Sequence, residues 1–133
     1  MKIQKTAFKG LKIIIGKIYY DSRGFFREIY KKKILKNHRP IFWCTSKSKK
    51  NVLRGLHLQT RNTQEKFVSV IKGKILDVVV DVRSKSKTFG KHFKIILSDK
   101  NAKSLLIPAG FAHGFLGLDK ENIILYSNSN YRS

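Results

Sequence analysis

The sequence predicts an all-β protein that folds as a β-sandwich or jelly roll with little helix. Apolar residues occur in many short runs separated by turn residues, a spacing typical of these two architectures. One run, residues 75–82, reads Ile-Leu-Asp-Val-Val-Val-Asp-Val and is rich in the β-branched residues that favour strands. The sequence contains no internal repeat, low-complexity linker or Pro-rich break. We therefore expect one folded unit made of many short strands.

The first part of the chain is expected to hold three strands and the only helical turn of any length. Residues 12–15 and 18–20 are expected to pair as two strands around Gly16, because a turn residue separates two apolar runs. Residues 25–30 form the next expected strand. The polar stretch 31–39 that follows is the expected place of the helical turn.

The remaining strands are expected to follow at short intervals. Residues 67–71 lead through Lys72-Gly73, which favours a hairpin, into the run 75–82. Asp77 and Asp81 in that run are an even number of positions apart, so their side chains share one face of the strand. The last expected strands are residues 93–97, 104–107, 111–118 and 123–126.

Length and composition predict a single domain, residues 1–133, in which 41% hydrophobic residues suffice to bury a core. No apolar run reaches the roughly 18 residues of a membrane helix. The N-terminal residues lack the pattern of a signal peptide. The one cysteine, Cys44, cannot form an internal disulfide. We therefore expect a cytoplasmic protein with no membrane partner.

The chain is strongly basic, with 29 Lys and Arg against 8 Asp and Glu, a net charge of +21. This charge fits either a polyanionic partner such as nucleic acid or a lysine-rich solvated surface. The excess is spread from end to end, and the runs 31–33 and 47–50 lack the interleaved aromatics of a base-stacking surface. The distribution favours the solvated surface, and we expect no nucleic-acid partner.

Two histidines stand in glycine-punctuated segments that could carry chemistry. Arg54 and His57 are an odd number of positions apart, so they face opposite ways on a regular strand unless Gly55 introduces a bulge. His113 follows Pro108 and Gly110, which make a turn, and small neighbours allow close approach of a ligand. Each histidine could also be a satisfied core residue. The chain lacks a His-x-His pair with a nearby carboxylate, so we expect no metal.

These segments, taken in order, resemble the signature of the dTDP-4-dehydrorhamnose 3,5-epimerase family. The similarity runs over nearly the whole chain, and its specificity lies in the order of the segments. The matching segments are Asp21-x-Arg-Gly-Phe-Phe-x-Glu28, Ser46-Lys-Ser-Lys-Lys-Asn-Val-Leu-Arg-Gly-Leu-His57-x-Gln59, Lys66, Gly73, Asp77-Val-Val-Val-Asp-Val-Arg83, Ser86-x-Thr-Phe-Gly90, Ile107-Pro-x-Gly-Phe-Ala-His-Gly-Phe115 and Tyr126.

The resemblance implies a cupin-type jelly roll that works as a homodimer without metal or organic cofactor. It implies inversion of C3 and C5 of dTDP-4-dehydro-6-deoxy-D-glucose to give dTDP-4-dehydro-L-rhamnose, in dTDP-rhamnose biosynthesis. His57 would abstract the protons that the C4 ketone acidifies, and Tyr126 would return a proton to the opposite face. Lys66 would stabilise the enolate oxygen, with Arg54 the next candidate.

The resemblance also implies which residues hold the substrate. Arg23, Glu28 and His113 match positions that contact the sugar nucleotide, and an arginine fork suits a diphosphate. Arg54 is a further binding candidate. Tyr131 matches an aromatic near the thymine, although its neighbour, often aromatic in the family, is Arg132 here.

Two departures from the family pattern keep alternatives open. Phe42-Trp43-Cys44 replaces a Gln-x-Asn element that contacts the ligand. The family continues beyond the position of Tyr131 with a segment that supplies an acidic partner for the catalytic histidine, and we expect the single domain to lack it; Asp77 or Asp81 could substitute if their face points to the site. The alternatives are a C3-only epimerase, an impaired paralogue that only binds a nucleotide sugar and, more remotely, a basic β-barrel that binds nucleic acid.

Overall fold

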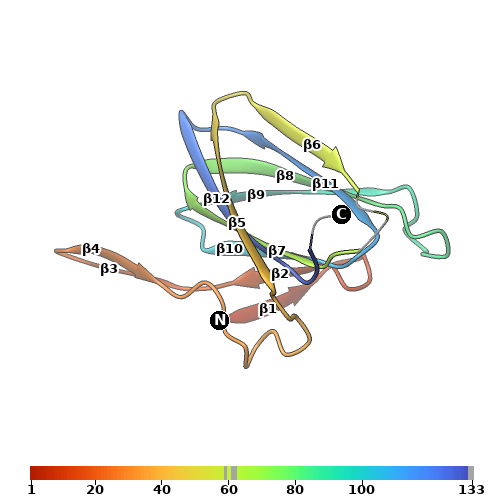
Figure 1. The fold of residues 1–133 in the computed structure, drawn as a ribbon. Coiled ribbons are helices and arrows are strands. Elements are labelled where there is room, and N and C mark those ends of the chain that lie inside the picture. Colours follow the sequence, from red (N-terminus) through yellow and green to blue (C-terminus); the bar gives the residue numbers. More distant parts are fainter. Residues whose placement is uncertain (59, 61–62, 132–133) are drawn as a thin grey trace.

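The computed structural model describes residues 1–58, 60 and 63–131, and strands are the only regular elements in this part of the chain (Figure 1). No helix among these residues could therefore cross a membrane. In chain order the strands are β1 (Lys2–Lys5), β2 (Lys12–Ile15), β3 (Ile18–Asp21), β4 (Gly24–Arg27), β5 (Phe42–Lys49), β6 (Leu53–His57), β7 (Lys66–Lys72), β8 (Lys74–Asp81), β9 (His92–Ser98), β10 (Lys103–Ile107), β11 (Phe111–Gly117) and β12 (Glu121–Asn128).

Two antiparallel sheets form the body of the molecule. One has six strands in the order β1-β2-β10-β7-β12-β5, and the other has four in the order β6-β11-β8-β9. Their inner faces pack together around a core that includes Val68 and Ile124 from the first sheet and Val79 and Phe115 from the second. The predicted β-sandwich or jelly roll is thus confirmed.

The strands alternate as their sequences require. In β8, every second side chain is buried, and the outward-facing residues between them are partly exposed. Asp77 and Asp81 are both buried on the inner face. The prediction that these two carboxylates share a face is confirmed.

The outer face of the six-stranded sheet is covered by the connection between β4 and β5, residues 28–41. Leu35 from this connection packs with Ile14, Phe67 and Leu106 of the sheet in a second apolar cluster. β3 and β4 precede it and form a separate two-stranded hairpin that projects away from the body (Figure 1).

Residues 31–39 hold short turns and no regular helix, and the amide of Leu35 donates to the carbonyl of Lys31, so one uncontinued helical turn lies in the expected stretch. Two other local predictions are wrong. The segments on either side of Gly16 do not pair: β2 lies between β1 and β10, where its isoleucines reach the core, and β3 pairs with β4.

The hairpin expected at Gly73 is also absent, since β7 and β8 belong to different sheets. Gly73 has a φ of 90° and turns the chain from one sheet to the other. Its amide donates to Asp99, and the next amide, that of Lys74, donates to the side chain of Asn122. These side chains replace the ladder bonds that a hairpin would have made.

Candidate active site

One end of the sandwich collects most of the predicted site residues. β6 ends at His57 and β12 ends two residues after Tyr126, while β7 begins at Lys66 and β11 begins two residues before His113. The antiparallel pairings β6–β11 and β7–β12 bring these strand ends together within each sheet. In Figure 1 this is the end near the C label.

His57 and His113 lie side by side on the inner face of the four-stranded sheet. They are direct partners in the β6–β11 ladder, and partners in an antiparallel ladder share a face. The neighbours of His113 at alternate positions, Phe111 and Phe115, belong to the core, so this face is the inner one. The imidazole of His57 is exposed because it stands at the strand end.

A bulge in β6 brings Arg54 to the same face, which is the alternative that the sequence left open at Gly55. Three steps from Arg54 to His57 oppose only two steps from Phe115 to His113, so the register shifts between the two pairs. Gly55 supplies the conformation, with a φ of 113°. A Cβ at this position would lie 2.5 Å from the Cα of Gly114, so the close approach of the strands also requires glycine.

His113 is held by a buried carboxylate. Its Nε2 lies 2.8 Å from Oδ2 of Asp77, which is fully buried. The other carboxylate oxygen, Oδ1, has no hydrogen-bond partner among the described residues. Asp77 therefore orients His113 and does not replace the acidic partner expected for His57.

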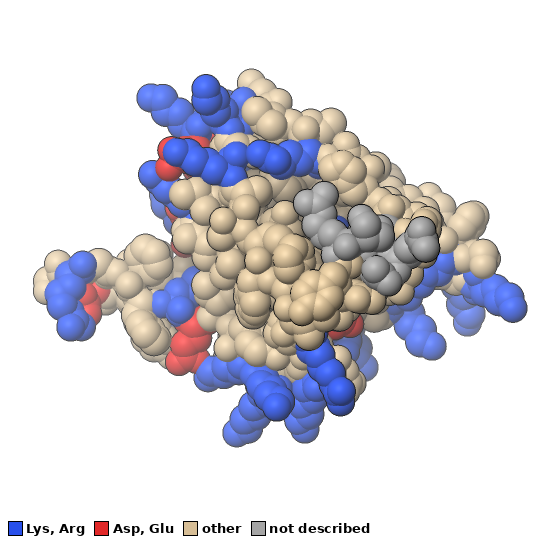
Figure 2. Space-filling model, in the orientation of Figure 1, with Lys and Arg blue, Asp and Glu red and all other residues tan. Residues whose placement is uncertain are grey.

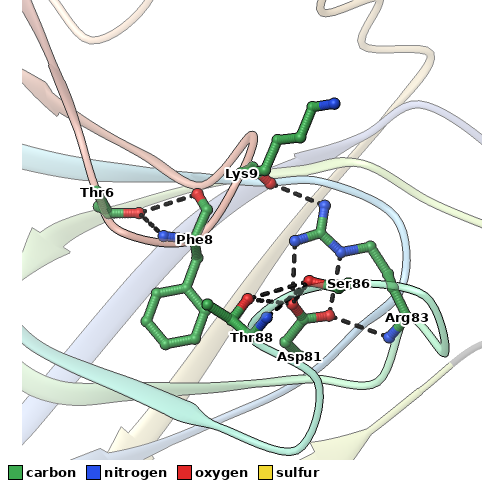
Figure 3. A network of polar contacts seen from close by, with 7 residues as sticks. All are labelled: Thr6, Phe8, Lys9, Asp81, Arg83, Ser86 and Thr88. Atoms are coloured by element: carbon green, nitrogen blue, oxygen red, sulfur yellow. Dashed lines mark hydrogen bonds and ion pairs between the residues drawn. The ribbon is translucent and has the colours of Figure 1, made fainter.

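Asp81 serves a different network, at the start of the loop between β8 and β9 (Figure 3). Arg83, Ser86 and Thr88 all donate hydrogen bonds to its carboxylate. Burial by itself raises the pKa of Asp81, but these three donors outweigh burial and hold the pKa far below its usual range. Arg83 also donates to the carbonyl of Lys9 and so ties this loop to the N-terminal segment.

A cavity of about 700 Å³ lies beside this network. The described residues that line it are basic or hydroxylic, apart from one alanine, and they include none of the predicted site residues: Ala7, Lys9, Arg83, Ser84, Lys85, Ser86, Lys87 and Thr88. Asp81 is thus a structural residue of the loop, and the sequence-based option that it supports His57 is not realised.

Tyr126 and Lys66 lie on the opposing sheet. Tyr126 is half-buried and packs against the main core, so it points inward. Lys66 precedes Val68 by two positions, and Val68 is both a core residue and the ladder partner of Tyr126, so Lys66 also stands on the inner face. The phenol and ammonium therefore come from the wall that faces the two imidazoles.

The element Phe42-Trp43-Cys44 runs beside this wall. Cys44 is the ladder partner of Tyr126 and therefore shares its face, while Trp43 points to the outer side. Tyr131 is exposed, and its ring lies 6.1 Å from that of Phe42. The proposed thymine-binding tyrosine is thus close to the element that departs from the family pattern.

Arg54 makes contacts with the strand β5 of the other sheet. Its Nε donates to Oγ of Ser48 at 2.7 Å, and its NH2 group donates to the carbonyl of Lys47. These bonds join the edges of the two sheets. Arg54 is exposed, so a ligand can contact its guanidinium. Such a contact must either leave the bonds to Ser48 and Lys47 in place or replace them.

Arg23 and Glu28 are not brought to His57 within one chain. Arg23 stands in the turn of the projecting hairpin with an 89% exposed side chain and pairs with Asp21, whose pKa this bond lowers. Glu28 lies at the base of the hairpin and pairs with Lys31 at 2.7 Å, which lowers the pKa of Glu28. Gln59 and Arg132, named in the sequence comparison, lie outside the described residues.

Sequence reasoning missed the pairing of His113 with Asp77. The even spacing of Asp77 and Asp81 placed both carboxylates on one face, but strand order alone decides which of them meets the histidine. β8 is the neighbour of β11 in the ladder, which no local pattern indicates.

Comparison with known proteins agrees with this architecture. Residues 5–133 match the family model described as dTDP-4-dehydrorhamnose 3,5-epimerase. The chain is 42% identical to dTDP-4-dehydrorhamnose 3,5-epimerase of Salmonella typhimurium over 139 residues, covering 100% of this chain and 76% of the relative. It is 43% identical to the enzyme of that name from Methanothermobacter thermautotrophicus over 126 residues, covering 92% of this chain and 68% of the relative.

A solved structure gives the same result. The dTDP-6-deoxy-D-glucose-3,5-epimerase of Legionella pneumophila, in complex with dTDP-4-keto-L-rhamnose, superposes with a TM-score of 0.93 at 42% identity, covering 99% of this chain and 73% of that one. The ordered motifs, the cupin-type jelly roll and these matches, which span nearly all of this chain, agree, and the chain belongs to the dTDP-4-dehydrorhamnose 3,5-epimerase family of isomerases.

Proposed function

We propose that this chain inverts C3 and C5 of dTDP-4-dehydro-6-deoxy-D-glucose, with His57 and Tyr126 as its acid–base pair. The observation that carries the proposal is the placement of an exposed imidazole and a half-buried phenol on facing walls at one end of the sandwich. A ketosugar ring between such walls is accessible to a base on one side and to an acid on the other. A carbon centre is inverted when its proton is removed from one face and a proton is returned to the opposite face, and this arrangement provides a group for each step.

In the proposed reaction His57 takes the proton from C3 or C5. The electron pair of the C–H bond moves into an enolate whose negative charge lies on the C4 oxygen. Lys66 stands on the same wall as Tyr126 and supplies a cation for that oxygen, which is worth up to roughly 3–4 kcal/mol for a well-placed donor. Tyr126 then gives its hydroxyl proton to the opposite face of the carbon, and the imidazolium and tyrosinate exchange protons with solvent.

The second histidine has a binding role in this proposal. His113 lies beside His57 and is fixed by Asp77 through Nε2, so its other ring nitrogen, Nδ1, has a defined direction. A ring held in this way can hydrogen-bond the sugar without searching among rotamers. Arg54 and Tyr131 are the proposed contacts to the nucleotide part.

A homodimer is part of the proposal. An isolated two-stranded hairpin is marginally stable in water, yet β3–β4 projects alone with Tyr20, Phe25 and Phe26 exposed. A second copy of the chain that covers this hairpin would bury these rings. It would also give Arg23, which is remote from the site of its own chain, a route to the site of the partner.

The surface charge supports capture of an anionic nucleotide sugar better than a nucleic-acid groove. Figure 2 shows Lys and Arg in several separate groups around the rim of the drawn face, with mostly uncharged surface between them. A field of this kind attracts small anions. We place the chain in the cytoplasm, in agreement with its single cysteine.

Solvent-exchange NMR in D₂O tests the proposal directly. The purified chain should introduce deuterium at both C3 and C5 of the 4-keto sugar nucleotide faster than buffer does. Exchange at C3 alone would identify the C3-only epimerase. Absence of exchange with retained dTDP binding would identify a protein that only binds the nucleotide sugar. Salt-sensitive binding to nucleic acid that is unchanged by His57→Asn would support a basic β-barrel that binds nucleic acid.

A further inference from the structure

His38 is a fully buried histidine that the proposed mechanism does not use. It belongs to the β4–β5 connection on the outer face of the six-stranded sheet, and its side chain has no exposed surface. Its Nδ1 lies 2.6 Å from Oε1 of Glu65, and its Nε2 lies 2.9 Å from Oγ of Ser127. Both ring nitrogens are therefore engaged.

The donor order follows from the chemistry of the three groups. An ionised carboxylate can only accept, so Nδ1–H of His38 donates to Glu65. Nε2 accepts the hydroxyl proton of Ser127 when the ring is neutral and donates to Oγ when the ring is protonated. The serine–histidine–acid order is also that of a nucleophilic triad, but Ser127 is 0% exposed and no substrate could reach it. Burial leaves a structural or positioning role.

The network ends on the two residues that adjoin Lys66 and Tyr126. Glu65 immediately precedes Lys66, and Ser127 immediately follows Tyr126. Successive side chains of a strand point to opposite faces, so Ser127 faces His38 while Tyr126 faces the candidate site. His38 thus links β7 and β12 from the outer face of the sheet, while Lys66 and Tyr126 of these strands stand on the inner face.

Further bonds make this bridge stiff. The amide of Glu65 donates to Oγ of Ser129 at 2.8 Å, and the amide of Ser129 donates to the carbonyl of Glu65 at 3.0 Å. Tyr30 donates its hydroxyl to the carbonyl of His38. A buried polar network whose members are all satisfied restricts the relative motion of the elements it joins.

We propose that His38 is a positioning residue, which acts through Glu65 and Ser127 to fix the offset between Lys66 and Tyr126. The inference rests on the proposed function of that site. A displacement of about 1 Å in a reacting group can cost on the order of 100-fold in rate. Loosening the bridge therefore lowers kcat, whereas Arg54 and His113, which would contact the substrate from the four-stranded sheet, keep KM nearly constant.

Two amide variants separate the two ends of the bridge. In His38→Asn the side-chain amide lies near the position of Nδ1 and can retain the bond to Glu65. In His38→Gln the amide reaches the position of Nε2 and can retain the bond to Ser127. Both leave fewer unpaired groups than His38→Ala and are the safer test of folding. His92→Asn, an exposed histidine on β9 of the other sheet, is the matched control.

The expected result is a kcat lowered roughly 10-fold by His38→Asn or His38→Gln and up to about 100-fold by His38→Ala, with KM changed less than about 3-fold. Ser127→Ala combined with His38→Ala should lower kcat no further than His38→Ala alone, because both act through one network. A kcat that stays at the wild-type value in folded His38 variants overturns the inference. Additive losses overturn it as well, since they indicate independent destabilisation.

Amide hydrogen exchange keeps this test separate from that of the proposed function. In the His38 variants the amides around Lys66 and Tyr126 should exchange faster, while those of β8 and β9 keep wild-type rates. If the wild-type chain proves inactive on the sugar nucleotide, the proposed function fails, and selective loosening of β7 and β12 still supports the bridge. Uniform or unchanged exchange rates contradict it.

Discussion

Buried Asp77 and partly buried His113 form a pair at the candidate site, with 2.8 Å between Oδ2 and Nε2. Replacing Asp77 by Asn keeps the shape of the side chain but removes the charge that orients the ring. We expect the affinity for a dTDP-sugar to fall about 10-fold, which corresponds to the roughly 1.4 kcal/mol of one charged hydrogen bond. Calorimetric titration measures this. Asp119→Asn, outside the site, is the control, and an unchanged affinity for Asp77→Asn would contradict a binding role for His113.

At the scale of single residues, sequence reasoning predicted part of the candidate site. His57, Lys66, His113 and Tyr126 were expected at one site, and the strand ends bring them to one end of the sandwich. The buried partner of His113 and the bridge through His38 could not be predicted. Their members come from segments distant in sequence, and only the strand order and the fold of residues 28–41 bring them together.

Among the elements, β6 depends most clearly on one glycine. An alanine at Gly55 would place its Cβ 2.5 Å from the Cα of Gly114 and would require a φ of 113°, so the β6–β11 register must shift. We expect Gly55→Ala to lower the free energy of unfolding by about 1–3 kcal/mol and to displace His57, which lowers activity at least about 10-fold. Urea unfolding and the deuterium assay measure the two effects.

Gly90→Ala is the control that tests backbone strain at a positive φ without the steric clash that Gly55→Ala introduces. Gly90 has a φ of 79°, but a Cβ there meets nothing within 4 Å. This variant should lose some stability and keep its activity. Equal losses of activity in both variants would contradict the role assigned to the bulge.

The β3–β4 hairpin supports a prediction about assembly. Phe25→Ser removes an exposed ring that the proposed dimer would bury, so it should shift the chain from twice 15.4 kDa toward 15.4 kDa in sedimentation velocity. Phe89→Ser removes an exposed ring from the β8–β9 loop and should leave the mass unchanged. A wild-type chain that sediments as a monomer at all concentrations would refute the dimer.

Most of the expected strands have nearly the predicted bounds, but β1, β5 and β6 were not among them, the strand expected at 25–30 ends at Arg27, and the partners of several strands differ from the prediction. The expected strand near residues 104–107 corresponds to Lys103–Ile107, because a run of buried apolar residues marks it. The predictions of the partner of β2 and of a hairpin at Gly73 were wrong. Turn residues indicate that the chain reverses direction, but they do not indicate which sheet the next strand joins. Core packing decides which sheet a strand joins, because alternate residues from the strands of both sheets form the core.

For the whole molecule, the lowered pKa of Asp81 predicts a loss of stability in acid. Burial raises the pKa of Asp81, but Arg83, Ser86 and Thr88 hold it far below its usual value, and the unfolded value is near 3.9. A lowered folded-state pKa stabilises the protein above about pH 4, and this contribution is lost as the pH falls further.

Asp81→Asn should therefore reduce the free energy of unfolding by about 2–3 kcal/mol near neutral pH. The deficit relative to the wild-type chain should shrink below pH 4. Urea unfolding between pH 2.5 and pH 7 measures both curves, with Asp119→Asn as the control for a lost surface charge. Parallel curves for Asp81→Asn and wild type would show that the loop network does not carry the acid dependence.

The most direct measurement follows exchange and inversion separately, by NMR of the 4-keto sugar nucleotide in D₂O with the wild-type chain, His57→Asn and Tyr126→Phe. If the imidazole and phenol act from opposite walls, His57→Asn abolishes both deuterium uptake and inversion. Tyr126→Phe still exchanges the proton through His57 but returns it to the same face, so deuterium enters with the configuration kept. Full inversion by Tyr126→Phe, or undiminished exchange by His57→Asn, would contradict the assignment of the acid–base pair.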